Sequence, residues 1–317
     1  MITAKLEKIA FHLPDMVISN ELLVSEMGLS WTAEDIYNKT GIRSRHIAKA
    51  DERASDLAYE SANKLFLENK DLREKIDGII FCSQSSDYIL PSTAPILQAR
   101  LGLSTSCLAI DINQGCSGFI QGLAVAKSLI ETKMAHNVLL LTAETYSKYI
   151  AKDDKATRTI FGDGAAACLI GADTAGREYI NNFVFGTDGR GFKNLMVADT
   201  AKPILFMDGS EIFQFTLQAV PKTVKEILAK AELSITGIDY FIFHQANAFI
   251  LEHLRSKLKI PREKFFIDLA TTGNTVSASI PIALKMAQEQ KLIKRGDKVM
   301  LVGFGVGYSW GGCIVEI

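Results

Sequence analysis

The feature that most constrains the fold of this 317-residue chain is a series of segments that occurs twice. An apolar run that opens Ile-Asp, a turn into an apolar helical pattern, a buried strand and a Gly-rich turn into another strand follow one another in both halves. They occupy residues 76–82, 115–130, 137–144 and 163–170, and again 238–244, 273–284, 298–305 and 308–315. Strands that alternate with helices predict βαβ units, and their repetition predicts a fused duplication. We therefore predict an α/β fold with two halves, residues 1–172 and 173–317, and an active site between them.

Shorter patterns complete the first half. Residues 2–10 predict a strand, and Ser55 is expected to cap a helix that runs to about Asn69. Residues 90–94 are expected to open a further helix that Gly102 closes. None of these patterns indicates a separate domain.

Composition excludes several classes of protein. The formal net charge is −1, whereas nucleic-acid binders usually carry a basic excess. No apolar run approaches the roughly 18 residues of a membrane span, and the first residues lack a signal-peptide core. The five cysteines are scattered without a C-x-x-C pair, which argues against a disulfide framework and a structural zinc site. We expect a cytoplasmic protein without a bound metal.

A cysteine occupies the turn between a strand and a helix. The apolar residues 108–110 lead into Gly115-Cys116-Ser117-Gly118, and the helical pattern follows at once. Free N–H groups and the dipole at a helix N-terminus favour a thiolate, and small neighbours leave room for a second molecule. This is the layout of a nucleophile elbow. From this stretch alone, a buried structural cysteine is an equally good interpretation.

Two polar residues of the second half occupy comparable places. His244 ends an apolar run, and Asn274 follows Gly273 just before a helical pattern. Taken singly, they are also typical of a structural histidine and a helix N-cap. Because the two elbows correspond, Cys116 and Asn274 should lie near a pseudo-twofold axis. The Gly-rich loop at 303–312 leads into a strand instead of a helix, so it fits a dinucleotide site poorly.

Together these stretches resemble the thiolase-fold condensing enzymes, and specifically the beta-ketoacyl-acyl-carrier-protein synthase III family, over the whole chain. The resemblance rests on the joint order of six segments: Thr40-Gly41-Ile42-Arg43, Cys116-Ser117-Gly118-Phe119, Phe161-Gly162-Asp163-Gly164-Ala165, His244-Gln245-Ala246-Asn247, Gly273-Asn274-Thr275 and Trp310-Gly311. It implies a thiolase-like fold in which two duplicated halves form five αβαβα layers.

The resemblance also implies a mechanism, a decarboxylating Claisen condensation. Cys116 would take an acyl group from acyl-CoA or an acyl carrier protein, with the backbone N–H groups of Cys116 and Val306 as the oxyanion hole. A malonyl thioester would then lose CO₂, and His244 and Asn274 would stabilise the enolate that attacks the acyl group. The substrates are CoA or phosphopantetheine thioesters, so no cofactor is expected, and the acyl carrier protein is the expected partner.

By the same resemblance, several other residues are expected at the substrate. Phe304 would assist loss of the carboxylate, and Leu90 would reach across a homodimer to the acyl pocket of the partner. The remaining substrate-binding positions are Lys155, Phe213, Asn247 and Gly209.

The chain departs from the family pattern in places that concern substrates more than chemistry. Asp35 stands where a Trp usually stacks on the CoA adenine, with Trp31 four residues away, and Lys155 replaces an Arg. Val306 replaces a glycine. Positions that are commonly basic for carrier docking hold Gln214, Phe249 and Ser256, while Arg255 and Lys257 remain. Two alternatives therefore stay open: an acyltransferase that passes the acyl group to a non-malonyl acceptor, and a non-catalytic acyl-binding subunit, which the intact Cys116, His244 and Asn274 disfavour.

Overall fold

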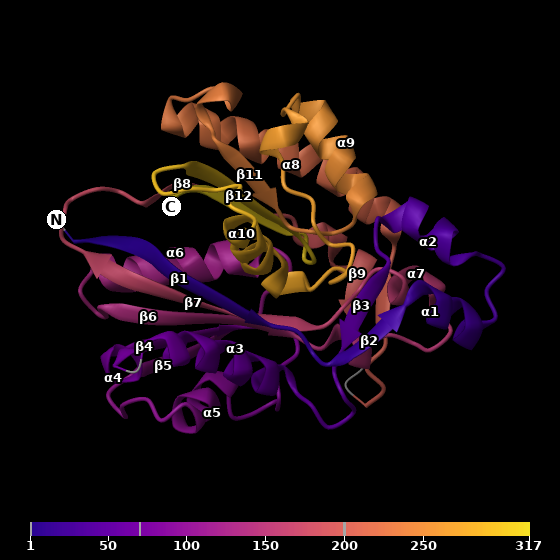
Figure 1. Cartoon of the computed structure of the whole chain (residues 1–317), viewed down its shortest axis with the longest axis horizontal. Helices are drawn as coiled ribbons and strands as arrows, with labels where there is room; N and C mark the ends of the chain where they lie inside the picture. Colours follow the sequence, from indigo (N-terminus) through magenta and orange to yellow (C-terminus); the bar gives the residue numbers. More distant parts are fainter. Residues whose placement is uncertain (1, 70, 199–200) are drawn as a thin grey trace.

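The computed structural model describes residues 2–69, 71–198 and 201–317 as five alternating layers of helices and sheets. Figure 1 shows the layers from bottom to top: outer helices, a first sheet, central helices, a second sheet and further outer helices. The predicted αβαβα thiolase-like architecture is confirmed. Strands of the first sheet lie between residues 3 and 173 and those of the second between 180 and 316, so the junction of the two halves follows the last strand of the first sheet.

The two sheets share one topology. The first has the order β1-β7-β6-β4-β5 and the second β8-β13-β12-β11, so that β8, β13, β12 and β11 correspond to β1, β7, β6 and β4. In both sheets the first two pairs in this order are antiparallel and the third pair, β6 with β4 or β12 with β11, is parallel. In the first sheet β5 adds a further parallel pair with β4. In the place of β5, the second sheet has a bridge between Phe241 and Phe265. The strands are β1 Thr3–His12, β4 Gly78–Cys82, β5 Leu108–Ile112, β6 Asn137–Glu144, β7 Gly164–Asp173, β8 Ile180–Thr187, β11 Tyr240–Phe243, β12 Lys298–Gly305 and β13 Ser309–Glu316.

The central layer consists of one helix from each half, α6 (Gly118–Glu131) and α10 (Ser279–Glu289), which contact both sheets. Their residues explain this position: α6 buries Phe119, Leu123 and Ile130 completely, and a helix that is apolar on most faces belongs in a protein interior. The outer helices α3 (Ala54–Glu68) and α5 (Thr93–Arg100) cover the first sheet, and α8 (Gly209–Ala231) and α9 (Ala248–Leu258) cover the second (Figure 1).

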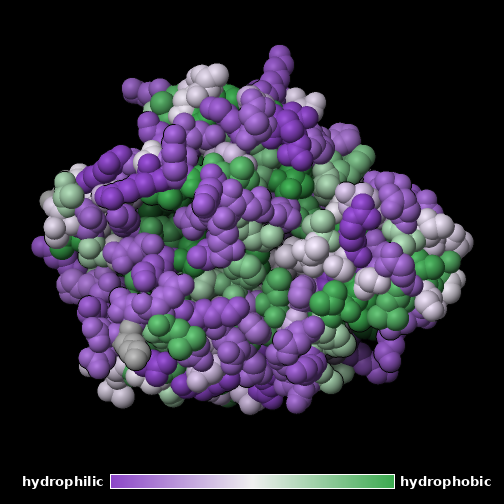
Figure 2. Space-filling view, viewed as in Figure 1, coloured by the Kyte–Doolittle hydropathy of each residue, from purple (hydrophilic) through white to green (hydrophobic). Residues whose placement is uncertain are grey.

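The smaller elements gather mainly at the right-hand end of Figure 1, where the central strands end. They are β2 Met16–Ser19, α1 Asn20–Met27, α2 Ala33–Thr40, β3 Ser44–Ile47, α7 Lys155–Arg158, β9 Leu195–Val197 and β10 Leu205–Met207, with α4 Leu72–Lys75 at the other end. The larger elements are connected by 3-10 turns that include η1 Tyr146–Lys148, η2 Gly189–Asn194, η3 Ile235–Gly237, η4 Arg262–Lys264 and η5 Val276–Ala278. Figure 2 shows that this face of the molecule is mostly hydrophilic, with hydrophobic areas at the same end.

The repeated Ile-Asp opening performs the same task in both halves. The backbone N–H of Asp77 donates to the Asn137 carbonyl, and its carboxylate accepts from the Asn137 N–H at 2.8 Å. Asp239 bonds Lys298 in the same two ways, with 2.9 Å between its carboxylate and the Lys298 nitrogen. Each aspartate thus fixes the register of its parallel strand pair, and the repeat found in the sequence is a repeat of structure.

One local prediction and one alternative interpretation are wrong. Ser55 does not cap its helix: α3 begins one residue earlier, the carboxylate of Asp56 accepts from the N–H of the N-cap Arg53, and the Ser55 hydroxyl donates to Asp87. Asn274 does not cap α10 either. The turn η5 precedes that helix, so Asn274 lies five residues before α10, whereas Cys116 lies two residues before α6. The two elbows correspond as elements but not residue by residue.

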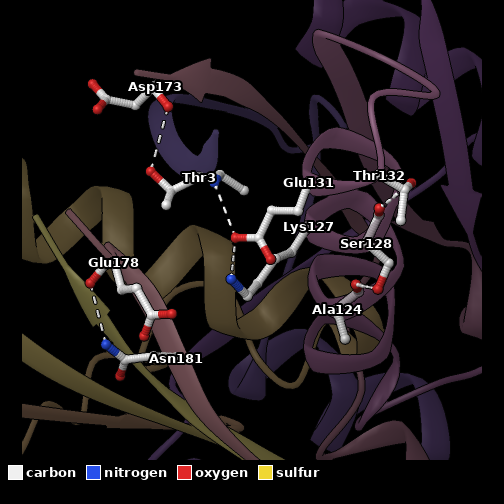
Figure 3. A network of polar contacts seen from close by, with 10 residues as sticks. Thr3, Ala124, Lys127, Ser128, Glu131, Thr132, Asp173, Glu178 and Asn181 are labelled. Carbon is white, nitrogen blue, oxygen red and sulfur yellow. Dashed lines mark hydrogen bonds and ion pairs between the residues drawn. The ribbon is translucent and has the colours of Figure 1, made fainter. Parts of the chain in front are cut away.

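The end of α6 that lies far from the elbow is held by polar contacts, which Figure 3 shows. Glu131 accepts from the backbone N–H of Ala4 on β1 at 3.4 Å and pairs with Lys127 one turn earlier. Ser128 and Thr132 bond back to carbonyls four residues before them. These contacts fix α6 along its length and so fix the position of Cys116 at its other end. No helix among residues 2–69, 71–198 and 201–317 is long and apolar enough to cross a membrane.

Candidate active site

Three polar side chains from distant segments line one narrow cavity between the two halves. Cys116, His244 and Asn274 share a space of about 90 Å³ with Phe304 and Gly305. The other lining residues are Ile160, Phe161, Leu195, Met207, Gly209, Ile212, Thr216, Ala246, Asn247 and Ile250. The structure therefore brings together the three residues that the sequence predicts as catalytic, at the predicted seam.

Glycines on β12 allow the second half to approach Cys116. A Cβ atom placed on Gly305 would lie 2.7 Å from the Cβ of Cys116 and 2.9 Å from its Sγ. A Cβ on Gly303 would lie 2.7 Å from the Cys116 carbonyl oxygen. The hydroxyls of Ser117 and Ser309, 2.6 Å apart, add a hydrogen bond across the same seam. The elbow of the first half is thus packed directly on a strand of the second.

The ionisation of Cys116 is set by opposing influences. Burial, followed by the negative charge of Glu144, raises the pKa of the Cys116 thiol to about 12, while hydrogen bonds from the backbone N–H groups of Cys116 and Val306 lower the pKa. The resting protein accordingly holds a thiol, and the thiolate expected at a helix N-terminus is not its resting form. The same two N–H groups are the predicted oxyanion hole, and they converge on the sulfur.

His244 is held as a neutral imidazole. It follows β11, its backbone N–H donates to the Val302 carbonyl at 2.8 Å, and its Nδ1 lies 2.7 Å from the Ser279 hydroxyl. Burial lowers the pKa of His244 to about 3, so the ring is uncharged at neutral pH. The Phe304 ring packs edge-on against it, with 5.4 Å between ring centroids. A neutral ring fixed at Nδ1 presents Nε2 as its free nitrogen.

Asn274 is anchored through its backbone and one side-chain atom. Its N–H donates to the Ile160 carbonyl at 2.9 Å, and its carbonyl accepts from the Gly162 N–H at 3.0 Å. Its Oδ1 accepts from the Val276 N–H at 2.9 Å, which opens the turn η5. Because the amide oxygen is used in this way, the amide nitrogen is the atom left to donate to a ligand.

The other predicted substrate residues fall into two groups. Phe304, Asn247 and Gly209 line the cavity, and Asn247 also caps α9 by accepting from the Ile250 N–H. Phe213, Lys155 and Leu90 lie outside its lining. Phe213 packs against Phe249 on the neighbouring helix at a centroid distance of 5.7 Å, and Leu90 is 80% exposed in the loop before α5.

The departures around the predicted adenine site have a structural explanation. Asp35 forms a capping box with Thr32 at the start of α2, so this position serves the helix terminus. Trp31 instead carries the aromatic ring, and the Nζ atoms of Lys155 and Lys39 lie 5.0 and 5.1 Å from its centroid. Trp31 and Lys155 therefore form an aromatic and cationic pair.

Four residues near the site were missed by the sequence analysis. Thr216 lines the cavity, and its buried hydroxyl has no hydrogen-bond partner in the part of the chain that the structure describes. Glu144 is fully buried with a pKa raised to about 8, mainly by burial. Gln84 and Tyr146 are joined by a hydrogen bond beside Cys116. The position of Glu144 at the end of a strand was a signal for that residue, whereas Thr216 lies inside a helical pattern without any distinguishing spacing. Among the described residues, no group of three or more His, Cys, Asp or Glu is placed to hold a metal ion.

Comparisons with known proteins decide the family. The family model for 3-oxoacyl-[acyl-carrier-protein (ACP)] synthase III matches residues 110–189, and the model for the C-terminal part of the same enzymes matches residues 228–317. The chain is 39% identical to a beta-ketoacyl-[acyl-carrier-protein] synthase III of Caldanaerobacter subterraneus, over 96% of this chain and 95% of the relative. This chain belongs to the beta-ketoacyl-[acyl-carrier-protein] synthase III family.

Other relatives agree with this membership. A synthase III of Streptococcus pyogenes is 36% identical over the full length of both chains. A crystal structure of a 3-oxoacyl-(acyl-carrier-protein) synthase III superposes with a TM-score of 0.96 at 44% identity, covering 99% of this chain and 100% of the other. The enzyme from Pseudomonas aeruginosa gives a TM-score of 0.92 at 33% identity, covering 99% and 98%. The chain is a condensing enzyme of the acyltransferase class, as the sequence predicted.

Proposed function

We propose that this protein catalyses the decarboxylating Claisen condensation of an acyl thioester, carried by CoA or by an acyl carrier protein, with malonyl-acyl-carrier protein. The observation that carries the proposal is the shared cavity: a thiol, a neutral imidazole and a carboxamide, contributed by both halves, face one narrow space. The catalytic roles follow from what each group can do there.

The first step uses Cys116 of the first half and the backbone of Val306 from the second. The Cys116 sulfur attacks the thioester carbonyl and expels the CoA thiol, which takes up the proton that Cys116 loses. The N–H groups of Cys116 and Val306, which point at the sulfur, are placed to receive the developing oxyanion. One such donor is typically worth about 100- to 1,000-fold in rate. The product is acyl-Cys116.

The second step uses the second half. A malonyl thioester releases CO₂ and leaves an enolate, whose oxygen accepts hydrogen bonds from His244 Nε2 and Asn274 Nδ2. The low pKa of His244 supports this role, because the step requires a neutral donor and no general base. The carbanion attacks acyl-Cys116, the sulfur leaves as a thiolate, and a beta-ketoacyl product forms. Phe304, edge-on to His244, excludes water and disfavours a charged carboxylate beside it.

The arm of the thioester also has partners in the cavity. A phosphopantetheine arm carries two amides, and the cavity offers the Thr216 hydroxyl and the side-chain nitrogen of Asn247. A buried hydroxyl without a partner is unfavourable, and a substrate amide would satisfy it. Recognition of CoA is assigned to the pair of Trp31 and Lys155, in place of the usual Trp and Arg.

We further propose a homodimer and a cytoplasmic location. Strand β5 forms the edge of the first sheet, and the loop before α5 exposes Tyr88, Ile89 and Leu90. An open strand edge beside exposed apolar side chains is a surface that natural proteins usually cover. All five cysteines are free thiols, which fits a reducing compartment.

The proposal is tested by supplying acetyl-CoA and then malonyl-acyl-carrier protein. Intact-mass analysis should show one acetyl group on Cys116, and the carrier should then gain the beta-ketoacyl group with release of CO₂. Acylation without CO₂ release and without chain extension would favour transfer to a non-malonyl acceptor. No adduct with a panel of short and medium acyl-CoAs and acyl carriers would contradict the proposal.

A further inference from the structure

A separate cavity lies at the end of the molecule where β2, β3, α1 and α7 gather (Figure 1). It measures about 470 Å³, within the range of roughly 300–1,000 Å³ that is typical of small-molecule sites. Phe161 lines both this space and the catalytic cavity, but Cys116, His244 and Asn274 do not line it. The proposed condensation uses none of its lining residues. We call this space the Arg45 cavity.

Arg45, on β3, brings a buried positive charge to the lining. It is 1% exposed. Its guanidinium donates to the carbonyls of Ile18 and Thr159 at 3.1 and 2.9 Å and to the side-chain oxygen of Asn20 at 2.9 Å. All three acceptors are neutral, and no carboxylate of the described residues forms an ion pair with Arg45. Because buried charges are usually paired, an arginine with only neutral partners favours an anionic ligand.

The same guanidinium has donors to spare. An arginine offers five N–H groups, and the bonds to the protein use three of them. Nε is buried without a hydrogen-bond partner in the described part of the chain. Burial, followed by the charge of Arg158, lowers the pKa of Arg45 to about 10 against a weaker effect of Glu21, so the group stays charged at neutral pH. Two free donors on a charged guanidinium match the two oxygens of a carboxylate.

The other charges around the cavity are mainly positive. Lys148, Lys152 and Arg158 line it, against one carboxylate, Glu26, among its described lining residues. Arg158 pairs with Glu26 at 3.0 Å, which leaves the two lysines as further cations. The buried Asp163 carboxylate is not part of the lining and accepts backbone hydrogen bonds from wall residues at 2.8 and 3.0 Å. The charges of the lining therefore favour an anion.

The rest of the wall is mostly apolar. Leu23 and Phe161 are buried, whereas Met16 is 40% exposed, so this wall runs from the interior to the surface. A small hydrated anion would leave it uncovered, whereas an aliphatic chain would remove it from water. The apolar lining residues are Met16, Ile18, Leu23, Ile47, Ala48, Ala50, Ile150 and Phe161.

We propose that the Arg45 cavity binds a monocarboxylate with an aliphatic tail, such as a medium-chain fatty acid. The carboxylate takes the unused donors of Arg45, and the tail covers the apolar wall toward Met16. The inference goes beyond the proposed function, because it concerns a noncovalent ligand at residues that the condensation does not use.

The test is calorimetric titration of the full chain with octanoate, with and without saturating CoA. One octanoate should bind per chain, and CoA should not displace it. Octanol has the chain without the charge, and acetate has the charge without the chain. Each should bind at least about tenfold more weakly, since a hydrogen bond to a charged group and the burial of several CH₂ groups are each worth more than one power of ten.

Two variants locate the ligand. Arg45→Met removes the guanidinium and should weaken octanoate binding by about tenfold or more. Because Arg45 also holds protein acceptors, the second variant changes only the exposed edge of the lining: Met16→Glu adds a like charge and should weaken binding several-fold. Met134→Glu is the matched control, because Met134 is 72% exposed and lines a different groove beside α6, and it should bind octanoate as wild type does.

Several results would overturn the proposal. They are no binding of octanoate, equally strong binding of octanol or acetate, and displacement of octanoate by CoA, which would place it in the catalytic cavity. Wild-type affinity in a folded Arg45→Met would also overturn it. If that variant does not fold, wild-type affinity in Met16→Glu, or an equal loss in Met134→Glu, does so. The titrations involve no malonyl substrate and no turnover, so failure of the proposed condensation would not change them.

Discussion

The two halves of the molecule have the same strands in the same order, yet they end in different chemistry. β4 and β11 pair with β6 and β12 in equivalent registers, which makes Cys82 and His244 equivalent positions. Cys82 is a buried thiol whose pKa burial raises far above its usual value, whereas His244 lines the cavity. The comparison teaches that the duplicated scaffold supplies positions, and that single residues at strand ends decide which positions react.

A second pair of equivalent strand ends shows the same principle. β6 ends in Glu144 and β12 ends in Gly305, each at the eighth position of its strand. The glycine lets Cys116 pack on β12, and the carboxylate fixes the segment that holds Gln84 and Ser85. At this pair of positions the first half thus contributes a carboxylate that holds a neighbouring segment, and the second half contributes a glycine that leaves room for Cys116.

The largest expected effect is at the elbow of the first half. Cys116→Ala removes the atom that carries the acyl group, so condensation should fall by about four orders of magnitude or more. Cys82→Ala, at the position equivalent to His244, is the matched control and should still be acylated and turn over. Product formation and intact mass check both variants; an acyl adduct on Cys116→Ala would assign the nucleophile to another residue.

The next effect concerns the contact between the halves. Gly305→Ala places a Cβ atom within 2.9 Å of the Cys116 sulfur, which forces the elbow or β12 to move. Acylation should slow by about a hundredfold, the size expected for a misplacement of about 1 Å at a reacting group. The matched control is Gly189→Ala. A Cβ atom at Gly189 meets nothing within 4 Å, so this variant should be acylated at the wild-type rate. Equal rates in both variants would show that the glycine is not needed for the approach.

Glu144, which holds the position of β6 equivalent to Gly305 of β12, should make the stability of the protein depend on pH. The pKa of Glu144 is raised from 4.5 to about 8, so between these pH values the folded protein keeps a proton that the unfolded chain has lost. Its contribution to stability is complete below pH 4.5 and is lost as pH rises through about 8. Glu144→Gln cannot titrate and so does not lose this stability as the pH rises. The free energy of unfolding of the variant, measured relative to wild type, should therefore rise from pH 5 to pH 8, by at most about 1.4 kcal/mol per pH unit. Denaturant unfolding at several pH values measures this, and parallel curves for the two proteins would contradict it.

The smallest effect separates substrate binding from stability in the second half. Thr216→Val removes a buried hydroxyl that has no hydrogen-bond partner among the described residues, so stability should rise by about 1 kcal/mol while the KM for the thioester also rises. Thr223→Val, on the same helix, removes a hydroxyl that donates to the Ala219 carbonyl at 2.9 Å and should be destabilising without an effect on KM. Thermal unfolding and steady-state kinetics test the pair of variants. A destabilised Thr216→Val with unchanged KM would assign Thr216 a purely structural role.

Much of the architecture could be predicted because the repeat has a direct structural cause. The two Ile-Asp openings fix register in the same way, and the apolar pattern of 118–131 specifies a helix buried on most faces. Cys116 and Asn274 could be placed at one seam because the two elbows correspond, and His244 was joined to them by the resemblance to the family motifs.

What the sequence did not reveal depends on contacts between segments far apart in the chain. The link between Gln84 and Tyr146 spans 62 residues, and the burial that raises the pKa of Cys116 comes from both halves. The turn η5, which shifts Asn274 away from its helix, places Val276 at a φ of 52°, a conformation that a β-branched residue rarely adopts and that no local pattern predicts.

The division of labour between the halves is tested most directly by a load-and-chase measurement on His244→Ala. Protein is first acetylated with acetyl-CoA, then mixed with malonyl-acyl-carrier protein, and the acyl-Cys116 mass and released CO₂ are followed in time. The account predicts normal acetylation, followed by CO₂ release and condensation that are slower by about 100- to 1,000-fold. Condensation at the wild-type rate, or loss of acetylation in a folded variant, would contradict it.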